Sequence, residues 1–122
     1  MKNKVLLIDD DVIICELGKE MFELLDIEAH TSETLEEALT YFKANHQDVA
    51  IVLIDFILGE VSGVDVYNEL VKISTDFTAV LASGIFVEDD APKYSEMGFK
   101  EIVRKPYNLA TLKELIAKYI TN

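Results

Sequence analysis

The residues of this chain best suited to chemistry stand at the ends of strand-like segments. The apolar run VLLI leads directly into Asp9 and Asp10, and the run VAIVLI leads into Asp55. Two further segments end at Ser83 and at Lys105. If these segments are parallel strands, three carboxylates, one hydroxyl and one ammonium meet at the carboxyl edge of one sheet, where such sheets bind ligands.

Three consecutive acids after a buried strand need a partner, because adjacent carboxylates repel each other and are costly to bury. A hard divalent cation is such a partner: Mg²⁺ takes one or two carboxylates, keeps several waters and often shares its coordination with a phosphate. We expect Asp9 and Asp10, which are nearest to the strand end, to be the ligands. Asp11 is expected to face solvent or to start the following helix.

The same set of groups suits phosphoryl transfer. A carboxylate can attack phosphorus and form an acyl phosphate, and Asp55 ends the strand predicted to be central. Mg²⁺ would offset the developing charge, Lys105 would balance the remainder, and the Ser83 hydroxyl could hydrogen-bond a phosphoryl oxygen. Each residue alone also fits a helix cap, a turn or a loop. The conjunction at four strand ends favours the functional interpretation.

Five strand–helix pairs would position these groups. Short apolar segments suited to a sheet covered on both faces alternate with segments of helical periodicity. We expect strands at residues 4–9, 27–30, 49–55, 77–83 and 100–104, and helices at residues 12–25, 32–45, 64–73, 88–97 and 109–120. The segment between residues 56 and 63 is expected to be a loop. This alternation predicts an α/β domain with a parallel sheet and right-handed crossovers.

Several residues mark the helix ends. Either Ser32 or Thr34 could cap the second helix, and Thr34 with Glu37 fits a capping box. Asn108 is expected to cap the last helix. Pro92 is tolerable only in the first turn of the fourth helix, because proline lacks an N–H group.

Composition and charge narrow the functional classes. A length of 122 residues indicates one domain, spanning residues 1–122. The net charge of -12 argues against binding nucleic acid or anionic membranes. The one cysteine, Cys15, excludes an intrachain disulfide and is expected to be a small buried hydrophobe. No signal peptide or membrane span is recognised, so a cytoplasmic location is expected.

The sequence resembles the response regulator receiver domain of two-component signalling, in the manner of single-domain chemotaxis regulators. The resemblance extends over the whole chain and rests on four motifs, which are LLIDDD, VLIDFILGEVSG, VLASG and VRKPY. Each motif alone is weak, and the four together are highly specific.

This resemblance implies the flavodoxin-like (βα)5 fold, a doubly wound sandwich whose five-stranded parallel sheet has the strand order 2-1-3-4-5. It implies that Asp55 accepts a phosphoryl group from a histidine kinase or a histidine phosphotransfer protein, with Lys105 and Ser83 assisting. It also implies a cis bond between Lys105 and Pro106. Finally, it implies a Mg²⁺ site formed by three carboxylates and one main-chain oxygen, those of Asp9, Asp10, Asp55 and the backbone carbonyl of Ile57.

The sequence departs from the family pattern at several positions. Ile102 replaces the aromatic residue that usually takes part in the switch, so signalling is expected through Ser83, the loop at 84–89 and the fourth helix instead. Gly59 replaces the usual proline four residues after the acceptor, which predicts a more mobile loop. Ile57 and Ile85 flank the path of the hydrolytic water in such domains. Because neither can hydrogen-bond that water, we expect slow self-dephosphorylation.

Other functions remain as alternatives. A degenerate receiver that binds partners without phosphorylation would fit the missing aromatic residue and proline, although the acids, Ser83 and Lys105 are intact. A phosphatase would need a second aspartate where Ile57 stands. We therefore expect no catalysis beyond the chain's own phosphorylation and dephosphorylation.

An output partner is expected on the surface of the fourth helix, fifth strand and fifth helix. The apolar side chains of the last helix, which could serve either a homodimer or the core, are Leu112, Leu115, Ile116 and Tyr119.

Overall fold

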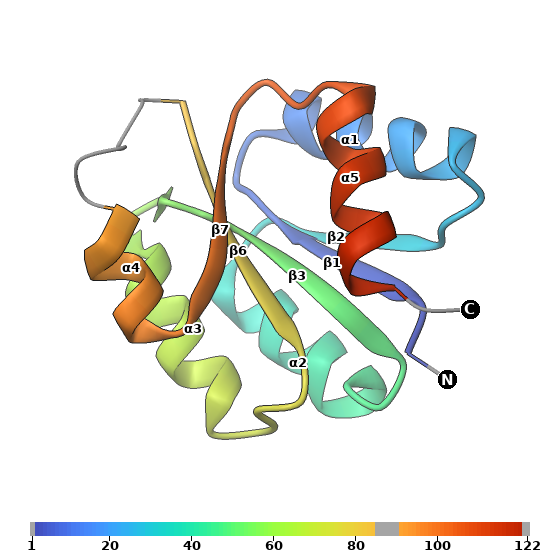
Figure 1. Ribbon diagram of the computed structural model, residues 1–122. Helices are drawn as coiled ribbons and strands as arrows, with labels where there is room; N and C mark the ends of the chain where they lie inside the picture. Colours follow the sequence, from blue (N-terminus) through green and yellow to red (C-terminus); the bar gives the residue numbers. More distant parts are fainter. Residues whose placement is uncertain (1, 85–90, 121–122) are drawn as a thin grey trace.

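A computed structural model of the chain, which describes residues 2–84 and 91–120, shows a parallel sheet between two layers of helices (Figure 1). The strands of this sheet are β1 (Lys4–Ile8), β2 (Ala29–Ser32), β3 (Val49–Asp55), β6 (Thr78–Ser83) and β7 (Phe99–Arg104). The helices are α1 (Val12–Leu24), α2 (Leu35–Asn45), α3 (Gly63–Val71), α4 (Ala91–Met97) and α5 (Leu109–Tyr119). Two short strands, β4 (Ile57–Leu58) and β5 (Val61–Ser62), form a separate antiparallel hairpin.

The order of strands in the main sheet is β2-β1-β3-β6-β7, and all neighbouring pairs are parallel. With the hairpin left out of the numbering, this is the order 2-1-3-4-5, so the predicted flavodoxin-like fold is confirmed. The strand order reverses between β1 and β3, and ligands of doubly wound sheets bind at the carboxyl edge beside that reversal. At the opposite, amino edge of the sheet, β1 begins and α5 ends (Figure 1).

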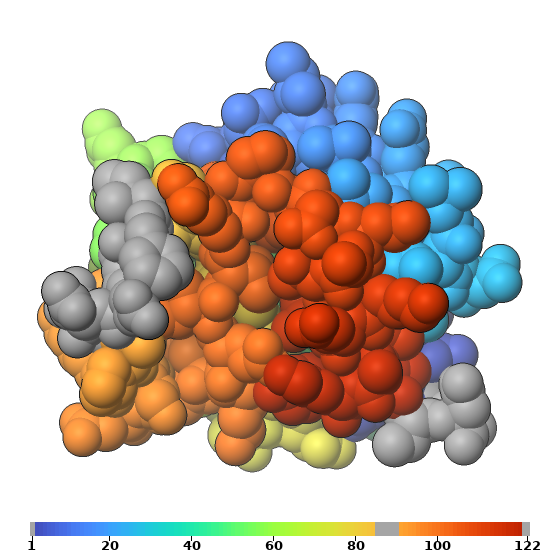
Figure 2. Space-filling view, turned by 45° about the horizontal axis from the view of Figure 1, so that its top comes forward, coloured from blue at the N-terminus to red at the C-terminus, as the bar shows by residue number. Residues whose placement is uncertain are grey.

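The two faces of the sheet bury separate apolar clusters. Successive side chains of a strand point to opposite faces, so Val5 and Leu7 of β1 pack towards α1 and α5, whereas Leu6 and Ile8 pack in the cluster on the other face. Every residue of β3 is buried, as its continuous apolar run predicts. In the space-filling view, α5 lies beside α1 in the layer that covers the first face (Figure 2).

The second strand begins two residues later than predicted. Asp26 has a positive φ of 60° after α1, and the Ile27 N–H still bonds back to the Phe22 carbonyl, so Ile27 belongs to the turn rather than to β2. Ser32 remains in β2, where its carbonyl accepts from the Asp9 N–H at 3.0 Å. Of the two candidate caps, the structure therefore selects Thr34.

The predicted capping interactions are otherwise present. The Thr34 hydroxyl accepts from the Glu37 N–H at 3.1 Å, and the Asn108 side chain accepts from the Thr111 N–H at 2.8 Å. Pro92 lies in the first turn of α4. The predicted start of this helix at residues 88–90 lies outside the described residues. Within the part of the chain that the structure describes, no helix has the length and apolar character needed to span a membrane.

The segment predicted as a loop after Asp55 is instead the β4–β5 hairpin. Ile57 pairs with Ser62, and Leu58 pairs with Val61, across a two-residue turn. The first residue of the turn, Gly59, has a φ of +62°, which few residues other than glycine adopt readily. The prediction failed because two-residue strands are too short to show a periodic pattern.

Candidate functional site

The structure brings the predicted residues together at the carboxyl edge of the main sheet. Asp9 and Asp10 follow β1, Asp55 ends β3, Ser83 ends β6 and Lys105 follows β7. Asp9, Asp55 and Ser83 are buried, whereas Asp10 is exposed. The parallel arrangement of four strands therefore produces the convergence that the sequence indicates.

The three carboxylates form a cluster with the dimensions of a cation site. One oxygen from each of Asp9, Asp10 and Asp55 lies within 4.8 Å of the others. The Lys105 ammonium lies 2.9 Å from Asp9 Oδ2 and 2.8 Å from Asp55 Oδ1. Three carboxylates against one ammonium leave two negative formal charges unbalanced. A divalent cation with a preference for oxygen would neutralise this charge, so the donor set fits Mg²⁺.

Asp9 is held from several sides. Its Oδ1 accepts from the Asp11 N–H at 2.9 Å, and its carbonyl accepts from the Cys15 thiol at 3.2 Å. Burial raises the pKa of Cys15 to about 12, so this residue is a neutral structural thiol, as predicted. Asp11 caps α1, because its carboxylate accepts from the Ile13 N–H at 2.9 Å. The third acid of the run thus starts the helix, which was one of its two expected roles.

Asp10 has a partner that sequence reasoning missed. Its Oδ2 accepts a hydrogen bond from the Gly59 N–H at 3.1 Å, across 49 positions of sequence. The one signal in the sequence was the replacement of the usual proline by Gly59, which adds an N–H donor at that position. The hairpin therefore contacts the carboxylate cluster directly.

The electrostatics of the site follow from burial and from the ammonium. Burial raises the pKa of the Asp55 carboxyl, and the neighbouring Asp9 adds to the rise, whereas the hydrogen bond from Lys105 lowers it; the net shift is upward. Burial lowers the pKa of Lys105, but the hydrogen bonds to Asp55 and Asp9 and the negative charges of these two residues together raise it by more. Lys105 therefore remains charged and holds the two buried carboxylates close together.

Three isoleucines and one proline complete the set of positions that the sequence singles out. Ile57 lies in β4, two residues after Asp55, and its side chain is 57% exposed. Ile102 lies in β7 and packs against the cluster on the side of the sheet that includes Tyr94 of α4. Ile85 lies outside the described residues. The bond between Lys105 and Pro106 is cis, as expected.

Similarity to known proteins agrees with this geometry. The sequence matches the response regulator receiver domain family over residues 5–117. It is 28% identical over 115 residues to a probable transcriptional regulator, ycf27, of Cyanophora paradoxa, and 27% identical over 116 residues to a CpxR homolog of Haemophilus influenzae. These alignments cover 94% and 95% of this chain, and 47% and 48% of the two relatives. The chain thus spans about half the length of these relatives.

Two solved structures share the fold. A response regulator receiver domain protein from Clostridium thermocellum superposes with a TM-score of 0.85 at 28% identity, covering 95% of this chain and 92% of the other. The response regulator TrrA from Thermotoga maritima, solved in complex with Mg²⁺-BeF, gives a TM-score of 0.79 at 30% identity and covers 97% and 98%. Because the family match extends over nearly the whole chain, the protein belongs to the response regulator receiver domain family, whose members are phosphoacceptor domains of two-component signalling.

Proposed function

We propose that residues 1–122 form one receiver domain that accepts a phosphoryl group on Asp55 and thereby changes its binding to an output partner. The donor is a histidine kinase or a histidine phosphotransfer protein in the cytoplasm. The observation that carries this proposal is the cluster of three carboxylates, in which the Lys105 ammonium is hydrogen-bonded to two of them. The negative charge of the cluster exceeds the positive charge of this one ammonium.

In this reaction, a carboxylate oxygen of Asp55 forms a bond to phosphorus while the phosphorus–nitrogen bond of the donor breaks. The donor imidazole leaves with the electron pair of that bond. Lys105, whose ammonium lies 2.8 Å from the Asp55 carboxylate, would pair with a phosphoryl oxygen, and Ser83, which ends the neighbouring strand β6, would donate its hydroxyl to another. Bound Mg²⁺, held by Asp9, Asp10, Asp55 and the carbonyl of Ile57, would offset the added negative charge.

Exposed apolar side chains near the carboxyl edge support docking of a protein donor. Val12 and Ile13 open α1 directly after the acidic run, Ile57 follows Asp55 on the hairpin, and Leu109 opens α5 after Lys105. Apolar side chains around a polar site are typical of surfaces that exclude water when a protein binds. We propose that the donor packs its histidine-bearing surface on these side chains.

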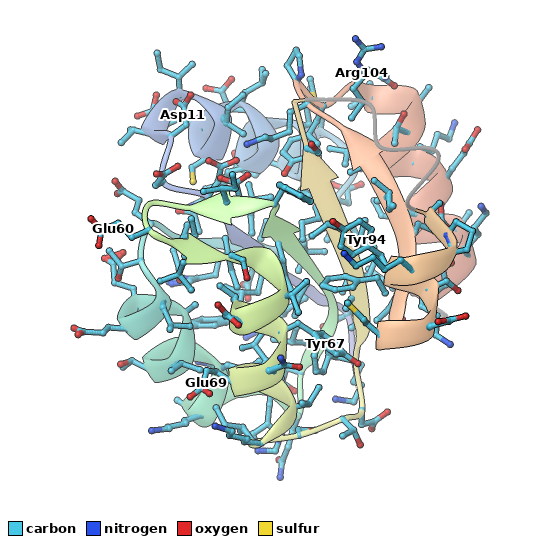
Figure 3. All side chains as sticks on the ribbon, turned by 90° about the vertical axis from the view of Figure 1, so that its left-hand side faces the viewer. Asp11, Glu60, Tyr67, Glu69, Tyr94 and Arg104 are labelled. Atoms are coloured by element: carbon cyan, nitrogen blue, oxygen red, sulfur yellow. The ribbon has the colours of Figure 1, made fainter. Side chains whose placement is uncertain are left out.

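The output surface is proposed on α4, β7 and α5. The Tyr94 ring of α4 packs edge-on against Phe56, with ring centroids 5.9 Å apart, and it also meets Phe99 at 6.3 Å. Phe56 is the residue directly after Asp55, so this aromatic contact joins the acceptor to α4 without an aromatic residue at Ile102. Figure 3 shows Tyr94 on α4, close to the strands of the main sheet.

Four apolar side chains of α5 belong to the core rather than to a free dimer surface. Leu112 and Leu115 are buried, and Ile116 and Tyr119 pack against the same cluster. A homodimer that forms through α5 would therefore have to use other side chains of this helix. The intact carboxylate cluster and its bound ammonium also favour the phosphoacceptor over the degenerate receiver.

Incubation with acetyl phosphate and Mg²⁺, followed by intact mass measurement, tests the function. The native chain is expected to gain one phosphoryl group, and Asp55→Asn is expected to gain none. Asp65→Asn, which removes an exposed carboxylate in the first turn of α3, serves as the matched control and should behave like the native chain. Absence of an adduct on the folded native chain, with this donor and with a phosphorylated histidine protein, would contradict the proposal.

The phosphorylated form is expected to persist for minutes or longer. The exposed side chain of Ile57 cannot orient a hydrolytic water by hydrogen bonding. Loss of the phosphoryl mass over time, after removal of the donor, measures the lifetime. Ile57→Asn is expected to shorten the lifetime. Val12→Asn, which adds an exposed amide at the start of α1 instead, is the control and should leave the lifetime unchanged. A lifetime of seconds in the native chain would refute this expectation.

A further inference from the structure

We infer that Gly59 is a positioning residue of the metal site, because its main-chain N–H orients the Asp10 carboxylate from the turn of the β4–β5 hairpin. This inference rests on the proposed function, which places Mg²⁺ at the carboxylate cluster. The role inferred for Gly59 depends on its backbone N–H group, which proline at the same position would lack.

The three carboxylates are held in different ways. Asp9 and Asp55 share the Lys105 ammonium, which lies between them. Asp10 is exposed, and within residues 2–84 and 91–120 its side chain has one hydrogen-bond partner, the Gly59 N–H at 3.1 Å. Without this bond an exposed aspartate side chain would rotate freely, and ordering it upon metal binding would cost conformational entropy.

The hairpin that supplies the N–H group is itself fixed. Leu58 is 4% exposed and packs in the apolar cluster that includes Phe42 and Leu70. At the base of the hairpin, the Gly63 N–H donates to the Phe56 carbonyl at 2.7 Å. The turn therefore presents its N–H group from a packed element, and Figure 3 shows its second residue, Glu60, at the tip between the start of α1 and α2.

The backbone conformation, and not a lack of space, explains the glycine. A β-carbon at position 59 would have no atom of the described residues within 4 Å, so the site has room for a side chain. The φ of +62° is the feature that disfavours other residues. Proline is fixed near a φ of -65° and has no N–H group, so it would remove both the turn and the bond to Asp10.

The Asp10–Gly59 bond engages Oδ2 and leaves Oδ1 without a hydrogen bond in the described part of the chain. Asp10 can thus offer one oxygen to a cation while the other stays bound to the hairpin. Ile57, whose carbonyl is proposed as a ligand, pairs with Ser62 in the same hairpin. The hairpin therefore contributes to the metal site at two points.

Titration with Mg²⁺ in a calorimeter tests the inference. Gly59→Pro is expected to weaken Mg²⁺ binding about tenfold, because a hydrogen bond to a charged group is lost. Gly59→Ala should show a smaller loss, and Gly59→Asn should remain close to the native chain, because asparagine tolerates positive φ and keeps the N–H group. Gly84→Ala is the matched control, since no described residue lies within 4 Å of a β-carbon at position 84 and its φ is not positive, and its affinity should not change.

A double variant separates this role from general damage to the hairpin. If Gly59 acts through Asp10, then Gly59→Pro should weaken Mg²⁺ binding little further in a chain that already carries Asp10→Ala, because alanine lacks the oxygen that accepts the Gly59 N–H. Equal Mg²⁺ affinity of Gly59→Pro and the native chain would overturn the inference, and so would a full tenfold loss in the Asp10→Ala background. Failure of the native chain to bind Mg²⁺ would instead show that the proposed function is wrong at its metal site.

Discussion

Replacing Lys105 with methionine is expected to slow phosphorylation of Asp55 about a hundredfold and to reduce the metal-free stability by about 3 kcal/mol. The ammonium is hydrogen-bonded to both buried carboxylates, at 2.9 and 2.8 Å, and its side chain is 16% exposed. Methionine keeps much of the length of the side chain but leaves Asp9 and Asp55 without a counter-charge. Urea unfolding in EDTA and the rate of phosphoryl gain from acetyl phosphate measure the two effects.

The loss of stability in Lys105→Met should depend on pH. Burial already raises the pKa of Asp55 in the native chain, and the hydrogen bond from Lys105 opposes that rise. Removing the ammonium therefore raises this pKa further. A carboxyl group with a raised pKa binds its proton more tightly in the folded state, so stability is greatest below the ordinary aspartate pKa and falls as the pH rises through the folded value.

The stability deficit of Lys105→Met is consequently expected to be small in acid and complete at pH 8. Mg²⁺ should restore part of it at pH 8, because a divalent cation supplies positive charge to the same carboxylates. Lys118→Met removes an exposed ammonium that pairs with Glu101, and it should cost less than about 1 kcal/mol at either pH. An equal deficit for Lys105→Met at both pH values would argue against the electrostatic explanation.

Replacing Gly63 with alanine is expected to destabilise the fold by about 2 kcal/mol and to slow phosphorylation as well. A β-carbon at this position would lie 2.5 Å from the Asp55 carbonyl oxygen and 3.0 Å from Leu81 Cδ1. The carbonyl belongs to the central strand and cannot move aside without displacing the acceptor. The direction of the change in unfolding free energy is informative, because alanine at an open helical position usually stabilises the fold relative to glycine, by up to about 1 kcal/mol.

Urea unfolding of Gly63→Ala, with Gly84→Ala as the control, checks this expectation. Among the residues that the structure describes, no atom lies within 4 Å of a β-carbon at position 84, so the same substitution there should leave the unfolding midpoint nearly unchanged. A normal rate of phosphoryl gain in a destabilised Gly63→Ala would show that the strand end carrying Asp55 stays in place. A variant as stable as the native chain would contradict the close approach itself.

The main sheet and its polar edge were predictable because both depend on strong, local patterns. A run such as VAIVLID can hardly form anything but a buried strand, and the residue at its end must then lie at the carboxyl edge. Asp9, Asp55 and Lys105 were placed together on that reasoning alone. The roles predicted for these residues follow from the chemistry of a carboxylate and an ammonium, and phosphorylation of Asp55→Asn and Lys105→Met tests them.

The features that sequence reasoning missed depend on tertiary pairing. Ile27 reads as a strand residue, but the positive φ of Asp26 and the register of β2 against β1 leave it in a turn. The β4–β5 hairpin pairs two residues with two, and its contact with Asp10 joins positions 49 residues apart. Neither a positive φ nor a long-range hydrogen bond produces a periodic pattern of residues in the sequence. Both occur at Gly59, so the glycine itself is the one indication of them.

The beginning of β1 and the end of α5 lie at the amino edge of the sheet, across the domain from the carboxyl end of β3 (Figure 1), where Asp55 stands. A surface linker, an affinity tag or a fused protein could therefore be joined to either end without blocking the approach of a large donor to the acceptor. Captured in this way on a sensor chip, the domain would present its carboxylate cluster to solution. Donor binding could then be recorded on the same immobilised molecules before and after phosphorylation.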